Sequence, residues 1–256
     1  MRRNKKIHNR VIVGLLLENR SAINTYKFKF SEYLGDPVNI VRIYNEKMID
    51  ELMVVDKSAF INGIDFDLLG DIARTARFPL SYCGNIKSLD DAKMVVKLGF
   101  EKIFLNSTYS HALANEISRF LGSSCLGLCI DIKKTIFGSY RHYYCRDDSI
   151  KNFNLIEYVQ SSILNGVGEV CVRYVDRDGA SLGYDTSHLA ELSSAASCPV
   201  IIAGGARGLD DFKSVMTHGA SACMASTLFS FYGPEKGVLP NYPSFNLLEE
   251  ELNSES

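Results

Sequence analysis

The chain has no tryptophan, only 6 prolines and no strong excess of either charge among its 256 residues. The formal net charge is −2 at pH 7, so no overall electrostatic field favours nucleic acid or a membrane surface as a partner. The apolar run near the N-terminus, VIVGLLL, is too short to span a bilayer, and no small-residue cleavage site follows it. We therefore expect neither a membrane span nor a signal peptide.

A regular set of paired cysteines is also lacking, because the 7 cysteines are odd in number and scattered along the chain. Cys125 and Cys129 are four residues apart, but a predicted strand would separate them by roughly 13 Å. We expect buried thiols that pack as small apolar groups, rather than disulfides or a metal site. This cysteine usage predicts a reducing, cytoplasmic compartment, and we expect neither a metal nor a cofactor.

The most informative feature that is present is an internal repeat. Residues 79–110 align without a gap against residues 199–230. Each copy predicts a short strand, a glycine-containing turn, an amphipathic helix, a glycine stop and a second strand. Two such halves supply eight β/α units, which predicts a closed barrel with two related phosphate-binding cradles.

Strand-like runs alternate with helical patterns along the chain, as parallel βαβ units require. The strands are predicted near 11–17, 51–56, 79–83, 102–106, 124–131, 169–175, 199–203 and 221–225, and the helices at 37–47, 64–76, 88–98, 109–120, 154–165, 186–195 and 208–218. The predicted fold class is α/β, a (β/α)8 TIM barrel built from two duplicated half-barrels. We expect one domain over 1–256, with half-barrels at about 9–123 and 124–232 and a tail, 233–256, that ends in a short helix.

Two of the predicted connections are unusually long. Residues 18–36 follow the first strand and residues 132–153 follow the fifth. Both begin at the carboxyl end of a strand, which is the face where such barrels build their sites. We expect them to act as lids over a site; the alternative is that they only decorate the surface.

Small and hydroxylated residues follow several predicted strands and are candidates for phosphate binding through backbone N–H groups. One cradle is predicted from Gly179, Gly204, Gly205, Ser226 and Thr227, and its symmetric counterpart from Gly84, Asn85, Asn106 and Ser107. The alternative is that these glycines only form tight turns. Two cradles on opposite sides of the barrel mouth predict an elongated ligand with a phosphate at each end.

Four segments together resemble a known family. The segments IDELMVVD, LCIDIKK, VDRDGASLGYD and PVIIAGGARGLDDF are similar to the cyclase subunit of imidazole glycerol phosphate synthase, HisF, and the resemblance covers roughly residues 9–231. It implies a (β/α)8 barrel that receives ammonia from a HisH-like glutaminase subunit at its N-terminal face. The ammonia then crosses the barrel to a phosphorylated acceptor at the C-terminal face, where two aspartates perform acid–base catalysis.

One of those two aspartates is missing from this chain. The resemblance places these two aspartates on the first and fifth strands. Asp131, at the end of the fifth predicted strand, matches one of them, and a carboxylate there suits general acid–base catalysis. The position of the other aspartate, on the first strand, is occupied by Leu16, which cannot transfer a proton. Glu18 would share its strand face but lies roughly 7 Å further along, so it is a weak substitute.

The resemblance is imperfect at other mouth positions as well. Asp56 and Asp178 match carboxylates that face the mouth in the family, and we expect them to contact the ligand. The family patterns differ at Asn24, Asn85, Arg173, Tyr174 and Ala203. An inward-pointing Arg173 would either fill much of the pocket or bind a different anion.

The opposite end of the barrel retains the family pattern. Each of four charged residues opens a predicted strand and matches a ring that gates ammonia entry: Arg10, Glu51, Lys102 and Glu169. Alternating cations and carboxylates can compensate one another where a single buried charge would be very costly. The alternative is a stabilising ion cluster with no gating role.

Three functions remain open. The first is a working cyclase subunit in histidine biosynthesis. The second, which we favour, is a HisF-like paralogue that channels ammonia from its glutaminase to another acceptor, with impaired ring closure; the implied role is amidation of a bacterial surface sugar together with a sugar amidotransferase. The third is a non-catalytic activator of a glutaminase.

Overall fold

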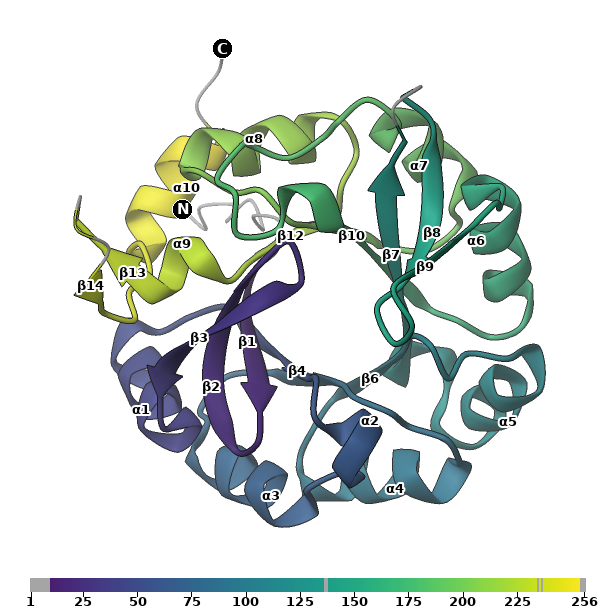
Figure 1. Ribbon diagram of the computed structural model, residues 1–256, viewed down its shortest axis with the longest axis horizontal. Coiled ribbons are helices and arrows are strands. Elements are labelled where there is room, and N and C mark those ends of the chain that lie inside the picture. The colour runs from purple at the N-terminus through teal and green to yellow at the C-terminus, as the bar shows by residue number, and fades with distance from the viewer. Residues whose placement is uncertain (1–9, 136–137, 234, 236, 254–256) are drawn as a thin grey trace, which may run out of the picture.

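The computed structural model describes residues 10–135, 138–233, 235 and 237–253. Parallel strands close into a barrel in the order β10-β11-β12-β1-β4-β5-β6-β7, and β7 pairs with β10 to complete the ring (Figure 1). The bounds are β1 Arg10–Glu18, β4 Glu51–Asp56, β5 Leu80–Cys83, β6 Lys102–Leu105, β7 Leu126–Lys134, β10 Glu169–Tyr174, β11 Val200–Ala203 and β12 Ala222–Ala225. The predicted (β/α)8 barrel is confirmed.

Helices cover the outside of this ring (Figure 1). They are α1 Pro37–Lys47, α3 Phe66–Thr75, α4 Leu89–Leu98, α5 His111–Leu121, α6 Leu155–Leu164, α7 Leu189–Ala195 and α8 Leu209–Thr217. Several begin at a side chain that accepts a backbone N–H, including Asp36 before α1, Ser110 before α5 and a capping box of Ser88 with Asp91 at α4. These local signals explain why the predicted helix boundaries lie within a few residues of those observed.

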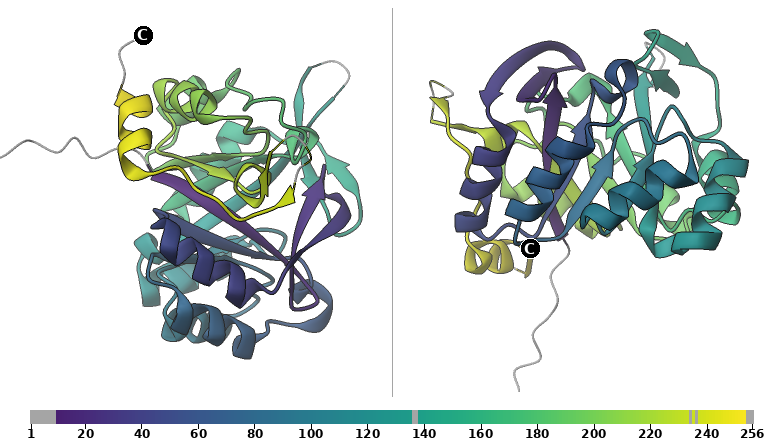
Figure 2. Two further views of the ribbon diagram at one scale, coloured as in Figure 1. Left: turned by 90° about the vertical axis from the view of Figure 1, so that its left-hand side faces the viewer. Right: turned by 90° about the horizontal axis from the view of Figure 1, so that it is seen from below.

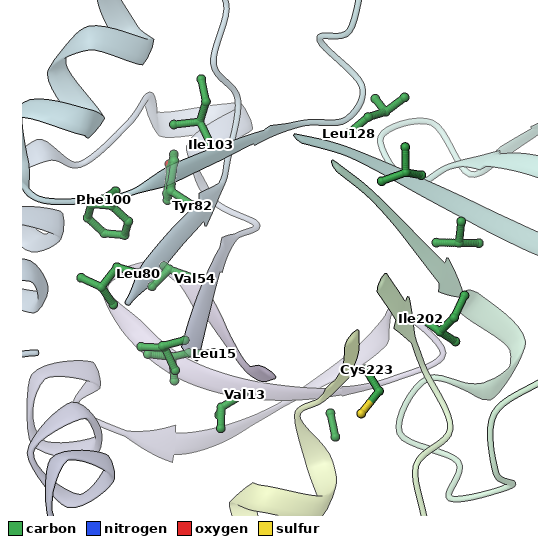
Figure 3. Packing of buried hydrophobic residues seen from close by; sticks show 14 of the residues in the cluster. Val13, Leu15, Val54, Leu80, Tyr82, Phe100, Ile103, Leu128, Ile202 and Cys223 are labelled. Atoms are coloured by element: carbon green, nitrogen blue, oxygen red, sulfur yellow. The ribbon is translucent and has the colours of Figure 1, made fainter. Parts of the chain in front are cut away.

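The apolar core has two layers, because successive strand residues point to opposite faces of the barrel wall. The larger layer lies between strands and helices; Figure 3 shows Leu80, Phe100 and Ile103 on the helix side of the strands. The smaller layer fills the inside of the barrel and includes Ile12, Met53 and Phe104 together with Cys83, Cys129 and Cys171. The interior is therefore a packed core, with room for a site only at its ends.

The two long connections fold as antiparallel hairpins. Strands β2 (Ser21–Tyr26) and β3 (Lys29–Gly35) continue from β1, and β8 (Tyr140–Tyr144) and β9 (Ser149–Lys151) continue from β7. Both project from the same end of the barrel, opposite the end at which β1 begins (Figure 2, right). They lie at the carboxyl ends of the strands, as predicted; residues 136–137 of the second connection lie outside the described residues.

Short elements complete the structure. They are α2 Ala59–Asn62, α9 Thr227–Ser230, β13 Phe231–Tyr232, β14 Gly237–Val238, α10 Phe245–Asn253 and two 3-10 turns, Ser123–Cys125 and Val175–Arg177. The tail thus contains the expected short helix. Cys125 lies in the first 3-10 turn instead of the predicted strand, because the strand starts one residue later. In the described ranges no helix combines the length and the apolar character that crossing a bilayer would require.

Candidate functional site

The carboxyl ends of the strands surround two cavities. The larger has a volume of about 320 Å³ and the smaller about 40 Å³. The larger is lined by the predicted residues Asp56, Gly84, Asn106 and Ser107, and the smaller by Asp178, Gly179, Gly204, Gly205, Ser226 and Thr227. The structure thus brings the members of each predicted cradle together, on separate sides of the mouth.

Asp131 lies beneath the mouth, and Arg173 donates hydrogen bonds to both of its carboxylate oxygens. Asp131 and Arg173 occupy the same level of the paired strands β7 and β10, so both side chains point into the barrel. The guanidinium donates two hydrogen bonds, from Nε to Oδ1 at 2.6 Å and from an Nη to Oδ2 at 2.9 Å. Asn106 donates a third, at 3.2 Å. The Asp131 side chain is only 1% exposed, so the ion pair and its charge-assisted hydrogen bonds are buried.

The pair also fixes the charge of Arg173. Burial is the largest single effect and lowers the pKa of Arg173, but Asp131 together with Cys129 and Cys83 outweighs it, so the net pKa is raised well above its usual value. The cation is therefore permanent. Arg173 points inward and borders both cavities, and its guanidinium is held by the chain's own Asp131. The binding of a different anion from a ligand stays a prediction.

Leu16 borders both cavities and so lies at the mouth, as the alignment predicts. Glu18, two residues further along β1, lines the larger cavity but forms an ion pair with Lys57 at 2.9 Å. The hydrogen bond from Lys57 lowers the pKa of Glu18. A carboxylate held in its charged form accepts a proton only weakly, so the prediction that Glu18 is a weak substitute stands.

The two other mouth carboxylates hold loops in place. Asp56 accepts hydrogen bonds from the backbone N–H groups of Ser58 and Ala59, both at 3.0 Å, at the start of α2. Asp178 accepts one from the Thr25 hydroxyl at 2.8 Å, which ties the first hairpin to the loop after β10. Burial raises the pKa of both carboxyls. Both lie at the mouth, as predicted, and the hydrogen bonds described here come from the protein itself.

Two glycines of the smaller cradle are required by the backbone. Gly204 has φ of +94° and Gly205 has φ of +114°, a region that side chains rarely adopt. A Cβ at these positions would lie 2.7 Å from the Tyr174 carbonyl oxygen and 2.3 Å from that of Gly183. The tight-turn alternative therefore accounts for these glycines without any ligand.

Several mouth residues were not singled out by the sequence. Phe28 lines both cavities, and Phe60 and Arg146 line the larger one. They come from the two hairpins and from α2, where neither spacing nor a motif marks a functional side chain. Asn24, at a lid position that departs from the family, accepts a hydrogen bond from the Thr227 hydroxyl at 2.7 Å.

The four predicted residues of the charged ring meet at the amino ends of the strands. Arg10 contacts both Glu51, at 2.5 Å, and Glu169, while Lys102 donates to Glu169 at 2.6 Å. Burial raises the pKa of Glu51, against the opposing effect of Arg10 and Lys102. Burial lowers the pKa of Arg10, but Glu169 and Glu51 outweigh it and the net change is a rise. The ring is a connected, nearly neutral cluster whose cations are the more exposed members.

A band of thiols lies between this ring and the Asp131–Arg173 pair. Cys83, Cys129 and Cys171 point inward from β5, β7 and β10 and are buried. A hydrogen bond with Cys129, followed by burial, raises the pKa of Cys83, and one with Cys171 raises that of Cys129. These two thiols are therefore neutral at pH 7, and all 7 cysteines are free. The expectation of buried, unpaired thiols is confirmed for this band.

A closed (β/α)8 barrel with a charged ring at one end and polar, glycine-containing loops at the other defines the class of this protein. Residues 10–234 match the family model described as "Histidine biosynthesis protein". The chain belongs to this family, that of the HisF-like barrels.

Full-length relatives support the same membership. The provisionally named imidazole glycerol phosphate synthase subunit hisF3 of Vibrio vulnificus is 34% identical over 95% of this chain and 96% of its own length. The similarly named hisF2 of Pseudomonas aeruginosa is 33% identical over 95% of this chain and 99% of its own. Imidazole glycerol phosphate synthase subunit HisF of Helicobacter hepaticus is 31% identical, covering 91% and 94% respectively.

Proposed function

We propose that the barrel channels ammonia from a glutaminase subunit at its N-terminal face to an acceptor at its C-terminal mouth, and that its own ring-closing activity is impaired. The observation that carries this proposal is the contrast between the two ends. The charged ring is connected through Arg10 and Lys102 to Glu169, whereas at the other end Asp131 is bound by Arg173 and Leu16 lines the mouth.

The impairment follows from proton-transfer chemistry. Ring closure in the family needs two positioned groups that exchange protons, and each such group contributes about 10²–10⁴-fold to the rate. Here one position holds an alkyl side chain, and the other holds a carboxylate that accepts three hydrogen bonds from Arg173 and Asn106. Both members of the pair are thereby lost to catalysis.

The acceptor we propose is a bacterial surface sugar, amidated together with a sugar amidotransferase in the cytoplasm. Two relatives support a role beyond the main pathway, because their names, hisF3 and hisF2, carry copy numbers. The free thiols agree with a reducing compartment. The glutaminase is proposed to be HisH-like and to dock around the charged ring.

The test is an assay of purified protein with an ammonium salt and the aminoribotide substrate of the family. We expect ring closure far slower than about 1 s⁻¹, the low end of ordinary enzyme turnover. The Helicobacter hepaticus relative, assayed in parallel, controls for the substrate and the conditions. Turnover near 1 s⁻¹ would defeat the proposal and favour the cyclase, whose support is that the residues of both predicted cradles line cavities.

The same purified protein distinguishes ammonia channelling from the third function, a non-catalytic activator of a glutaminase. The barrel is mixed with its glutaminase and glutamine, and both glutamate release and amidated product are measured. Glutamate release without any transfer of nitrogen to an acceptor would favour the activator. Ammonia channelling requires that the two products form in equal amounts.

A further inference from the structure

The turn of the first hairpin holds an aromatic ring over the barrel mouth. Lys27 and Phe28 form the two-residue connection between β2 and β3, with φ of +52° and +60°, as in a type I′ turn. Residues other than glycine and asparagine are uncommon in this conformation. The turn is clamped, because the Lys27 N–H donates to the Asp178 carbonyl at 2.9 Å and the Thr25 hydroxyl to the Asp178 carboxylate.

The Phe28 ring stacks on the ion pair beneath it. The Arg173 guanidinium carbon lies 5.2 Å from the ring centroid, within the range of a cation–π contact. Tyr143 of the second hairpin approaches the same ring, with centroids 6.4 Å apart. Four residues border both cavities and therefore separate them: Leu16, Phe28, Val55 and Arg173. We call these four residues the partition.

The partition places the two cradles in compartments of very different size. The cavity of about 40 Å³ beside Gly204 has room for only a few water molecules. The cavity of about 320 Å³ beside Gly84 falls within the range of small-ligand sites. A ligand with a phosphate in each cradle would have to displace Phe28 and break its stacking on Arg173.

The larger cavity has the chemistry of a site for one small, hydroxylated anion. Phe28, Phe60 and Phe104 supply apolar walls. Arg146, from the second hairpin, lies over the Phe60 ring at 4.3 Å, which positions a cation at the rim. The Asn85 side-chain oxygen is buried and has no hydrogen-bond partner among the described residues, so it can accept a hydrogen bond from a ligand hydroxyl.

We propose that the partition divides the mouth, and that the larger cavity binds a sugar carrying a single phosphate while excluding elongated ligands with a phosphate at each end. Arg146 and the Ser107 hydroxyl hold the phosphate, and Asn85 accepts a hydrogen bond from the sugar. This rests on the proposed function in one respect: the sugar monophosphate takes the place of the ammonia acceptor.

Isothermal titration calorimetry with ribose 5-phosphate and ribulose 1,5-bisphosphate tests the partition. We expect the monophosphate to bind one per chain and the bisphosphate at least about tenfold more weakly. Phe28→Ala removes the ring and should shrink this preference at least about tenfold. Phe30→Ala, on the same hairpin and 82% exposed, is the matched control and should change neither affinity.

A second variant tests the anion contact separately and does not disturb the hairpin turn. Arg146→Gln should weaken ribose 5-phosphate at least about tenfold, since a charge-assisted hydrogen bond to phosphate is lost. Arg74→Gln, on α3 and paired with Asp71, should have no effect. The proposal is overturned if the bisphosphate binds the unmodified protein as tightly as the monophosphate, if the monophosphate does not bind, or if Arg146→Gln changes nothing.

These titrations contain neither ammonia nor glutaminase. Failure of nitrogen transfer in the complex with the glutaminase would therefore leave the divided mouth standing. Failure of the titrations would leave ammonia channelling standing and remove only the assigned class of acceptor.

Discussion

At the scale of single residues, the mouth is governed by the pair of Asp131 and Arg173. A buried bidentate ion pair is stable only because both charges are present, and removal of one partner leaves the other uncompensated. In the proposed function, a carboxylate restored at position 16 would still face an Asp131 that is bound by Arg173. We therefore expect that an acid–base pair returns only when the arginine is also removed.

Leu16→Asp tests this directly. The single change should raise ring closure less than about tenfold, whereas Leu16→Asp combined with Arg173→Ser should raise it by about 10² or more, because both carboxylates can then exchange protons. Initial rates with ammonium and the aminoribotide measure the effect, with Arg173→Ser alone as the control. A large recovery with Leu16→Asp alone would show that Arg173 does not silence Asp131.

Asp185 gives a prediction for acid stability. It accepts hydrogen bonds from the Ser187 N–H, the Ser187 hydroxyl and the Tyr140 hydroxyl. Burial raises the pKa of Asp185, but these hydrogen bonds, with Ser187 first, outweigh it and the net pKa is lowered. A lowered carboxyl pKa stabilises the fold above the unfolded value of about 4, and the stabilisation is lost as the pH falls through the folded value.

Asp185→Asn should consequently lower the free energy of unfolding by about 2 kcal/mol at pH 7, the scale of hydrogen bonds to a charged group. Urea unfolding between pH 2 and pH 7 measures it. The difference from the unmodified protein should shrink progressively below about pH 4, where the unfolded wild-type chain takes up a proton that the folded carboxyl, with its lowered pKa, still excludes. A difference that stays constant across this range would contradict the assignment. Asp71→Asn, at an exposed pair, is the control.

At the scale of elements, the tail helix α10 lies outside the repeating β/α units, and it packs on the core through one side. Leu248 is fully buried in the outer apolar cluster, whereas Leu247, its neighbour on α10, is 42% exposed. The Tyr242 hydroxyl, in the segment leading to α10, donates to the Val11 carbonyl at 2.9 Å. The tail thus contacts the first strand of the barrel.

Leu248→Ala should destabilise the protein by about 2–5 kcal/mol, because it removes buried apolar surface and leaves a cavity. Leu247→Ala is the matched control and should change stability by less than about 0.5 kcal/mol. Thermal or urea unfolding of the two variants provides the comparison. Equal effects would show that α10 does not pack as described.

The strands and helices could be predicted closely, and the reason is local. Glycines 99 and 219 end the repeated helices with positive φ, and Ser88 caps α4, so each boundary is encoded within a few residues. The folding of the long connections into hairpins was not predicted. Their register depends on pairing with β1 and β7 rather than on a turn motif, since the first turn is Lys27-Phe28 and not an Asn-Gly pair.

Within the site, residues on the strands were predictable and residues on the hairpins were not. Alternation along β10 correctly directs Arg173 inward, and Asp131 lies opposite it in the register with β7. The stacking of Phe28 on Arg173 and of Arg146 on Phe60 joins segments far apart in the chain. No periodicity carries that information, so the division of the mouth could be found only in the structure.

At the scale of the whole molecule, the charged ring and the mouth lie at opposite ends of a packed barrel. In the proposed function, ammonia that enters through the ring would pass the neutral thiols before it reaches Arg173. A small neutral molecule meets no charged group along this thiol band, whereas an ammonium ion would be poorly solvated there. The arrangement therefore favours transfer of neutral ammonia over transfer of the ammonium ion.

Lys102→Ala opens the ring and should uncouple glutamine hydrolysis from ammonia delivery. Lys102 contacts Glu169, and its loss leaves that buried carboxylate with Arg10 as its remaining ionic partner. In the complex with the glutaminase, the ratio of glutamate released to nitrogen transferred should rise from one. Lys97→Ala, an exposed lysine on α4, is the control. An unchanged ratio would leave the ring with a purely stabilising role.

Strand β1 joins the two ends without interruption. Arg10, at its first residue, holds Glu51 and Glu169, and Glu18, at its last, leads directly into the hairpin that carries Phe28. At about 3.3 Å per residue, this extended segment is nearly 30 Å long. Hydrogen bonding to β12 on one side and to β4 on the other holds this segment within the barrel wall, so the separation between the Arg10 guanidinium and the first hairpin is set by the fold.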